Sequence, residues 1–168
     1  MTTEQQTPKG QGRLPPEWFM RLFWKCHRGV VNATDARFGL WREKPGKWGA
    51  MRIRAVGRTS GEPRPVIVGY YADGPDLVTM AMNGWRDGEP EWWRNVQAHP
   101  DLTVDTRDGP REVTAHAAEG DEYDRLWKRW SEIDANLDGY ASRRSMRTAV
   151  VVFSPREARA TNDGAGGT

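Results

Sequence analysis

The sequence predicts an α+β protein in which an antiparallel sheet closes into a barrel or rolls up. Short apolar segments alternate along the chain with turns rich in Gly, Pro and Asp, as expected of short β-strands. Two pairs of these segments are separated by so few residues that their strands must be antiparallel. Helical patterns lie between the strands, and closing the sheet would remove its exposed edges.

The first expected element is a helix from Pro16 to about Val31, where aromatic and apolar residues recur at helical spacing. Basic residues lie off this apolar stripe. Such a helix is suited to cover the domain, which we favour, or to lie on an anionic membrane surface. An aromatic loop broken by Gly and Pro follows at residues 38–49, where it could overhang a pocket.

Three strands are expected next. Residues 51–56 alternate apolar and basic side chains, which is typical of a half-buried strand, whereas residues 65–71 are continuously apolar. Residues 57–64 between them form a hairpin loop. A turn at 73–76 leads to the third strand at 77–82, which must run antiparallel to the second.

The second half of the chain continues the pattern. Pro90 and Pro100 mark the two ends of a short helix, and residues 140–146 form a polar loop. The expected elements are, in order, a helix at 91–99, strands at 102–106 and 112–117, a helix from Asp121 to Ile133 and a strand at 148–153. The last strand is fully apolar and is therefore expected at the centre of the sheet.

The composition excludes several classes of protein. The net charge of +2 arises from 25 basic and 23 acidic side chains, a balance that does not favour nucleic acid as a partner. Cys26 is the only cysteine, which excludes an intrachain disulfide framework and fits a reducing cytoplasm. The polar N-terminus is not a secretory signal, and no segment is long and apolar enough to span a membrane.

One domain is expected from the length of the chain. The two ends are polar and rich in Gly, so they cannot bury enough apolar surface to offset the entropy of ordering. The expected organisation is a disordered tail at 1–12, the N-terminal helix and aromatic loop at 13–48, a barrel domain at 49–155 and a disordered tail at 156–168.

Metal and covalent catalysis find little support. His27, His99 and His116 are scattered without the spacing of paired metal ligands, so no metal site is expected. The chain has no nucleophile elbow, Walker loop or dinucleotide-binding glycine motif. Ser60 precedes a glycine but lacks the strand-to-helix context of a nucleophile.

Residues 57–64, with the sequence Gly-Arg-Thr-Ser-Gly-Glu-Pro-Arg, have more than a hairpin needs. Two glycines let the main chain present amide groups, Thr59 and Ser60 add hydroxyls, and Arg58 and Arg64 stand at opposite ends. This composition fits an anion-binding cradle. It also fits an ordinary surface turn with solvated arginines, and these eight residues alone do not decide between the two.

Topology brings further residues to the same place. In an antiparallel meander the polar loop at 83–90 lies at the same end of the sheet as residues 57–64, because the turn at 73–76 takes the other end. The start of the helix at 91–99 lies beside that loop. Nine tryptophans in the chain suggest a core, an interface or an aromatic pocket. Together these features favour one elongated ligand that is anionic at one end and aromatic at the other.

These residues resemble a known family. The turn at 57–64, the pair Asn83-Gly84, the motif Pro-x-Trp-Trp-x-Asn-Val-x-Ala-His-Pro at 90–100 and the strand at 150–155 are similar to the deazaflavin-dependent nitroreductases of actinobacteria. The resemblance covers about residues 49–155. It implies an antiparallel split β-barrel of about six strands with flanking helices, and a cytoplasmic oxidoreductase that uses coenzyme F420, an 8-hydroxy-5-deazaflavin.

The resemblance also implies roles for individual residues. The turn around Arg58 would hold the phosphate and oligoglutamate tail, with Arg64 assisting, and the segments 80–83 and 92–95 would border the deazaflavin ring. The implied cofactor-binding residues are Arg58, Thr59, Ser60, Gly61, Arg64, Pro65, Met80, Met82, Asn83, Gly84, Trp92, Trp93 and Asn95. The expected reaction is hydride transfer to a small organic acceptor such as a quinone, enone or nitroaromatic compound.

The chain departs from the family pattern at two positions. Thr59 stands where the family usually has a lysine, which could weaken binding of the tail unless Lys47, Arg52 or Arg54 supplies the charge. Met82 stands where a serine is usual, which would make the surroundings of the ring more apolar. Tyr140, in the loop before the last strand, is the hypothetical donor or orienting group on the substrate side, although it also fits a packing role.

Other functions remain open at this stage. Related split barrels bind FMN with similar basic turns, so FMN is an alternative cofactor. A non-catalytic protein that binds the cofactor, or docks on the inner face of the membrane through the N-terminal helix, is a further alternative. The sequence is compatible with a monomer or a homodimer.

Overall fold

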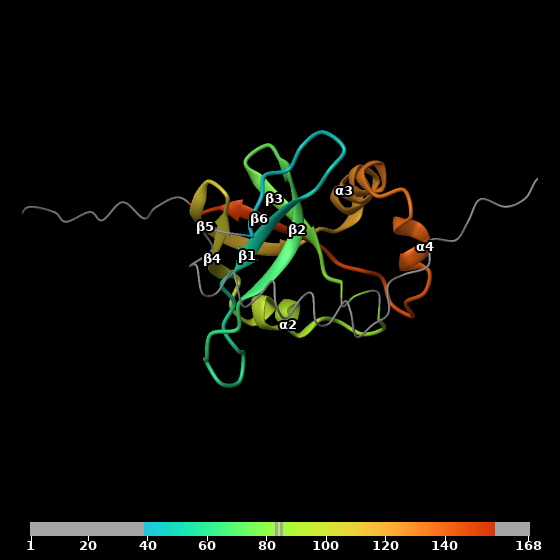
Figure 1. Ribbon diagram of the computed structural model, residues 1–168. Coiled ribbons are helices and arrows are strands. Elements are labelled where there is room, and N and C mark those ends of the chain that lie inside the picture. The colour runs from blue at the N-terminus through green and yellow to red at the C-terminus, as the bar shows by residue number, and fades with distance from the viewer. Residues whose placement is uncertain (1–38, 83, 85, 157–168) are drawn as a thin grey trace, which may run out of the picture.

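The computed structural model describes residues 39–82, 84 and 86–156. Its strands form a closed antiparallel barrel in the order β1-β2-β3-β6-β5-β4 (Figure 1). The strands are β1 Gly49–Ile53, β2 Val66–Asp73, β3 Asp76–Met80, β4 Asp101–Thr106, β5 Gly109–Ala117 and β6 Val150–Pro155. The helices in the described ranges are α2 Glu91–Ala98, α3 Gly120–Ile133 and α4 Leu137–Ala141.

The interior of the barrel follows from the alternation of side chains along its strands. In β1, Met51 and Ile53 are fully buried in a cluster with Val104, Val113 and Phe153 from the other strands. α2 adds Trp92, Trp93 and Val96 to the same cluster. This short helix therefore closes one end of the barrel with its apolar face (Figure 1).

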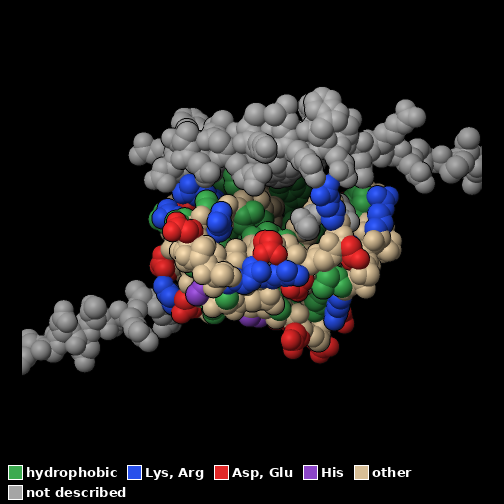
Figure 2. All heavy atoms as spheres, turned by 90° about the horizontal axis from the view of Figure 1, so that it is seen from below, with side chains coloured by type: hydrophobic (Ala, Val, Ile, Leu, Met, Phe, Trp, Pro, Cys, Tyr) green, Lys and Arg blue, Asp and Glu red, His purple; other side chains and the backbone are tan. Residues whose placement is uncertain are grey.

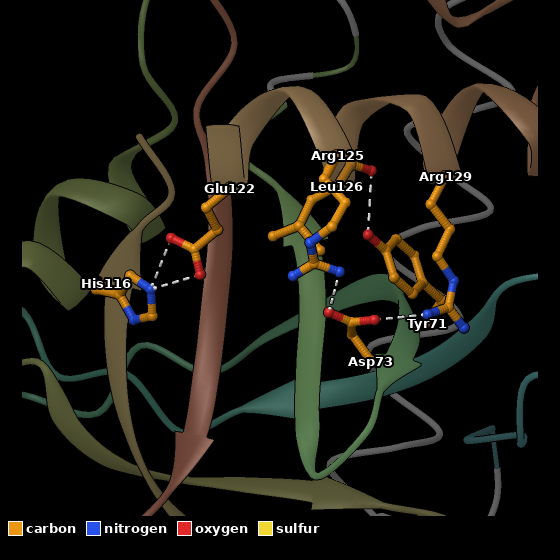
Figure 3. Close-up of polar contacts among 7 residues, drawn as sticks. All are labelled: Tyr71, Asp73, His116, Glu122, Arg125, Leu126 and Arg129. Atoms are coloured by element: carbon orange, nitrogen blue, oxygen red, sulfur yellow. Dashed lines mark hydrogen bonds and ion pairs between the residues drawn. The ribbon is translucent and has the colours of Figure 1, made fainter. Parts of the chain in front are cut away.

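The helix α3 covers the outside of the barrel through a second apolar cluster. Tyr71, Val78 and Met80 from β2 and β3 pack there with Leu126 and Trp130 of α3. Polar contacts fasten the same helix to β2 (Figure 3). The hydroxyl of Tyr71 donates to the carbonyl oxygen of Leu126 at 3.0 Å.

Ion pairs at the rim of this contact complete the attachment of α3. Arg125 and Arg129 each donate to Asp73 of β2 at 2.7 Å, and Arg129 also lies over the ring of Tyr71 (Figure 3). In the first turn of the helix, Glu122 contacts His116 of β5 at 3.3 Å (Figure 3). The segment that follows α3 thus begins from a helix fixed to the barrel.

The two ends of the barrel carry different segments. One end, which we name the turn end, bears the turn at 54–65, the loop at 81–90 and α2 (Figure 1). The opposite end, named the hairpin end, bears the turn at 39–48 and the two tight hairpins at 73–76 and 106–109. Antiparallel pairing requires this separation, because each hairpin reverses the chain at one end only.

Over residues 49–155 the predicted order of three strands, a short helix, two strands, a helix and a last strand is confirmed, with α4 as an added element, and the α+β barrel class with six strands is confirmed as well. β6 lies between β3 and β5, in agreement with the expected central strand. The polar loop expected at 140–146 is wrong in part, because Leu137–Ala141 forms the short helix α4. The N-terminal helix and both tails, apart from Arg156, lie outside the described residues.

Candidate functional site

The turn at 57–64 is closed by its own main chain. The amide of Gly57 donates to the carbonyl of Glu62, and the amide of Gly61 donates to the carbonyl of Gly57, both at 2.8 Å. Gly61 has a φ of +67°, a left-handed conformation that favours glycine. At Gly57 a Cβ would come within 2.6 Å of the hydroxyl oxygen of Ser60. Both glycines therefore serve the compact shape of the turn.

Several polar groups on this turn face solvent without a partner among the described residues. The side chain of Arg64 makes no hydrogen bond or ion pair there, although its own amide donates to Ala55. The amides of Thr59 and Ser60 are likewise unpaired within the described ranges, and both residues are exposed. Unpaired amides beside an arginine form an arrangement suited to an anion.

Arg58 ties the turn to α2. Its amide donates to Oδ1 of Asn95 at 3.1 Å, and its Nη1 reaches the same oxygen at 3.3 Å. Asn95 is 7% exposed, so this amide side chain is a buried support for the turn. Nη1 of Arg58 also donates to Oε2 of Glu91 at 2.7 Å. This hydrogen bond lowers the pKa of the Glu91 carboxyl, which is therefore ionised at neutral pH.

The predicted ring-contacting residues at the end of β3 and in the loop at 81–90 differ in how deeply they are buried. Met80 is 2% exposed and packs in the cluster beneath α3, whereas Met82 is half-buried at its margin. Gly84 is exposed with a φ of +58°. Asn83 lies outside the described residues, so its predicted contact with the ring stays a prediction.

Trp92 and Trp93 are buried in the barrel interior rather than displayed on its surface. They are 9% and 3% exposed, and their ring centroids lie 6.1 Å apart. Their packing fixes the start of α2 against the barrel. Their structural role is therefore to hold the helix that supports Arg58. Pro65, directly before β2, is exposed, and its predicted contact with the cofactor stays a prediction.

Tyr140 lies on α4 and is half-buried. The guanidinium of Arg143 lies 5.7 Å from the centre of its ring. Its predicted role toward a substrate remains a prediction.

The sequence reasoning missed a set of contacts that hold the loop at 81–90. Arg144 is 8% exposed and donates to the carbonyl oxygens of Ala81 and Gly88, at 3.1 and 2.8 Å. The amide and hydroxyl of Ser145 donate to the carboxylate of Asp87, at 3.0 and 2.6 Å, and these bonds lower the pKa of Asp87. The only sequence signal was the polar character of residues 140–146, which does not distinguish Arg144 from Arg143.

The hollows at the opposite end have a different character. One of about 470 Å³ lies between the turn at 43–46 and α3, and one of about 500 Å³ is lined by the exposed Trp41 and Trp48 with basic neighbours. Neither includes any of the implied cofactor-binding residues, and Lys47, which the sequence offered as a further charge for the tail, lines the second hollow instead. The aromatic loop, insofar as it is described, thus lies away from the turn end.

Charge at the turn end is mixed. Figure 2, which views the molecule from below Figure 1, shows Lys and Arg side chains spread across this face with acidic groups between them. Within the described ranges no cluster of His, Cys, Asp and Glu could hold a metal ion, and none of the helices there has the length and apolar character needed to cross a bilayer. The unpaired donors of residues 58–64 have the chemistry that an anion site requires, and the prediction of such a site stays a prediction.

Comparisons with known proteins agree on one class of enzyme. The model of a family described as F420H(2)-dependent quinone reductase matches residues 30–155. An F420H(2)-dependent quinone reductase of Mycobacterium tuberculosis is 29% identical over 137 residues, which cover 79% of this chain and 89% of that protein.

Solved structures share the fold. A structure of an F420-H2 dependent reductase, FDR-A, has a TM-score of 0.57 and 24% identity, covering 62% of this chain and 93% of its own. A structure described as a domain-swapped dimer has a TM-score of 0.61 and 22% identity, covering 82% of this chain and 98% of its own. At these identities the likeness establishes the split-barrel fold alone.

Proposed function

We propose, from the premise that this chain belongs to the F420H(2)-dependent quinone reductase family, that the turn end of its barrel is the site for reduced F420. The chain is an oxidoreductase that uses this deazaflavin to reduce quinone-type acceptors. In the proposed site, residues 58–64 hold the phosphate and oligoglutamate tail. The loop at 81–90 and the start of α2 border the ring.

The observation that carries this assignment is the set of unpaired donors on the turn. The guanidinium of Arg64 and the amides of Thr59 and Ser60 have no partner among the described residues. Arginine binds phosphate and carboxylate through two parallel hydrogen bonds, which suits a tail that carries both groups. The donors present therefore fit the anionic part of F420.

Arg58 has a different role from Arg64 in this proposal. Its amide is fixed by Asn95, and its guanidinium already contacts Glu91. A bound anion would share this guanidinium with Glu91 or displace the carboxylate. The guanidinium of Arg64 can then attract the anion without a competing carboxylate of the protein. The guanidinium of Arg58 also attracts the anion, and the amide of Arg58 fixes the position of the turn.

Reduced F420 supplies a hydride when it is bound. The protein's task is to hold the ring and the acceptor in contact and to admit a proton to the reduced acceptor. Trp92 and Trp93 keep α2 rigid against the barrel through their buried rings. We infer that Tyr140 orients the acceptor or donates to its oxygen.

The proposed cofactor site is tested by titrating the purified full chain with F420 and following fluorescence. Arg58→Ala and Arg64→Ala should each weaken binding by about 1–3 kcal/mol, because each removes charged hydrogen bonds to the tail. Arg107→Ala, at the hairpin end, is the matched control and should bind as the wild type does. Equal affinity of all four proteins, or tighter binding of FMN than of F420, would contradict the assignment.

The role of Tyr140 is tested by turnover rather than by binding. Tyr140→Phe removes the hydroxyl and keeps the ring that lies against Arg143. We expect a lower kcat with quinone, enone and nitroaromatic acceptors and little change in F420 affinity. Unchanged turnover with all three classes would withdraw the role of Tyr140 and leave the cofactor site intact.

The assembly and location of the chain are also proposals. A solved relative of the same fold is a domain-swapped dimer, which supports a homodimer as an alternative to a monomer. Light scattering of the full chain decides between them. We propose a cytoplasmic location, and sedimentation with anionic vesicles, with and without residues 1–35, tests contact of the N-terminal segment with a membrane.

A further inference from the structure

The segment between α4 and β6 is hydrogen-bonded to the loop at 81–90 through the buried guanidinium of Arg144. Nη1 of Arg144 donates to the carbonyl oxygen of Ala81 at 3.1 Å, and Nη2 donates to that of Gly88 at 2.8 Å. Nη1 also donates to the hydroxyl oxygen of Thr148 at 2.5 Å. Since both Nη atoms belong to one planar group, the two ends of the loop are held close together.

The surroundings of Arg144 are unusual for a charged side chain. It is 8% exposed, and all its hydrogen-bond acceptors in the described residues are neutral. Its Nε is a buried donor without a partner there. A buried charge is costly unless it is paired, so a position of this kind needs an explanation. The carboxylate of Asp87 is close enough for the charge of Arg144 to help lower its pKa, although the guanidinium donates only to neutral acceptors among the described residues.

We propose that Arg144 is a positioning residue of the cofactor site, which holds Ala81 and Gly88, near the two ends of the loop at 81–90, in place for the ring of F420. This inference rests on the proposed function and adds a residue to it. By joining Ala81 and Gly88, Arg144 closes the loop and removes the entropy that an open loop would have to lose on binding.

A second pair of contacts acts on the same loop. Asp87 directly precedes Gly88 in the loop. Ser145 donates to the carboxylate of Asp87 through both its amide and its hydroxyl. The segment therefore holds the loop at three points, through Ala81, Asp87 and Gly88. Lysine cannot replace Arg144 in this role, because a single ammonium does not present two parallel donors to two separate carbonyls.

Different residues are expected to act on the ring and on the tail of the ligand. Loss of Arg144 should weaken binding of the ring, whereas loss of Arg58 should weaken binding of the tail. The probes are full-length F420 and the same deazaflavin without its phosphate and glutamates. The variants are Arg144→Gln, Arg144→Lys, Ser145→Ala and Arg58→Ala, measured by fluorescence titration below the unfolding temperature of each protein.

Arg144→Gln should weaken both probes by the same factor, about tenfold, and Arg144→Lys should not restore them. Ser145→Ala should weaken both by about twofold to threefold, because it removes one hydrogen bond of the three-point contact. Arg58→Ala should weaken only full-length F420. The matched control is Arg147→Gln, since Arg147 lies on the same segment but contacts Asp124 and Tyr123 instead of the loop.

Three results would overturn the inference: wild-type affinity of Arg144→Gln for both probes, full restoration by lysine, or an equal loss in Arg147→Gln. If Arg144→Gln does not fold, Ser145→Ala decides, and its wild-type affinity for both probes counts against the proposal. Failure of the wild-type chain to bind full-length F420 would instead refute the proposed function. The two failures are therefore distinguishable.

Discussion

The two ends of the barrel contain similar residue types in opposite arrangements. At the turn end Trp92 and Trp93 are buried, 9% and 3% exposed, and Arg64 has no partner among the described residues. At the hairpin end Trp41 and Trp48 are 39% and 40% exposed, and Arg42 is paired with Asp108. Counting arginines and tryptophans would not tell the two ends apart.

The difference lies in what the buried polar side chains do. At the turn end, Asn95 and Arg144 are both buried and join segments far apart in the sequence. At the hairpin end the turn at 39–48 and the hairpin at 106–109 are joined by the exposed ion pair of Arg42 with Asp108, and exposed pairs of this kind contribute little to stability. We propose that this difference makes the turn end the anion site, because its unpaired donors are held in place by buried polar groups.

The largest effect is expected when the buried amide side chain of Asn95 is removed and the positive charges of the turn are kept. Asn95→Ala should leave the amide of Arg58 without its partner and weaken F420 binding by about 1–3 kcal/mol, with a similar loss of unfolding free energy. Isothermal titration and chemical denaturation measure the two effects. Asn95→Asp is a second variant, since it keeps an acceptor oxygen for the amide.

The matched change at the hairpin end is Asp108→Ala, which frees Arg42. We expect F420 affinity and the unfolding midpoint within error of the wild type, because the pair is exposed to solvent. A loss of cofactor affinity in Asp108→Ala as large as that in Asn95→Ala would break the distinction between the two ends.

Much of the fold could be predicted because side-chain periodicity reports directly on strands and helices. The alternation at 51–56 and the prolines at 90 and 100 located β1 and α2 within a few residues. The helix α4 was not predicted, because it has only five residues, one of them Gly139. So short a segment cannot show apolar residues recurring at helical spacing. Its existence depends on contacts such as that between Trp127 and Asp138, which local sequence does not specify.

The candidate site could be predicted only in outline. Antiparallel topology placed the turn at 57–64 and α2 at the same end of the barrel, and the structure joins them through Arg58 and Asn95. The partners of individual arginines were not predictable, because they depend on side-chain placement across distant segments. Glu91 beside Arg58 and Gly88 beside Arg144 are examples.

The smallest expected effect concerns Glu91, which competes with the F420 tail for the guanidinium of Arg58. Glu91 accepts a hydrogen bond from Arg58, so it occupies part of the guanidinium that we assign to the tail. Glu91→Gln should therefore tighten binding of full-length F420, by about threefold, and leave the tail-less deazaflavin unaffected. Fluorescence titration of both ligands measures this, and Glu132→Gln, on α3, is the control for loss of one negative charge.

The pH dependence of this effect has a definite sign. Arg58 lowers the pKa of Glu91, so the carboxylate is charged throughout the neutral range and the advantage of Glu91→Gln is constant there. The attraction between Arg58 and Glu91 is present above the ordinary pKa of glutamate and is lost as the pH falls through the lowered value. The difference between the two proteins should therefore disappear only in acid. Weaker binding in Glu91→Gln at neutral pH would mean that Glu91 orients Arg58 for the tail and does not compete with it.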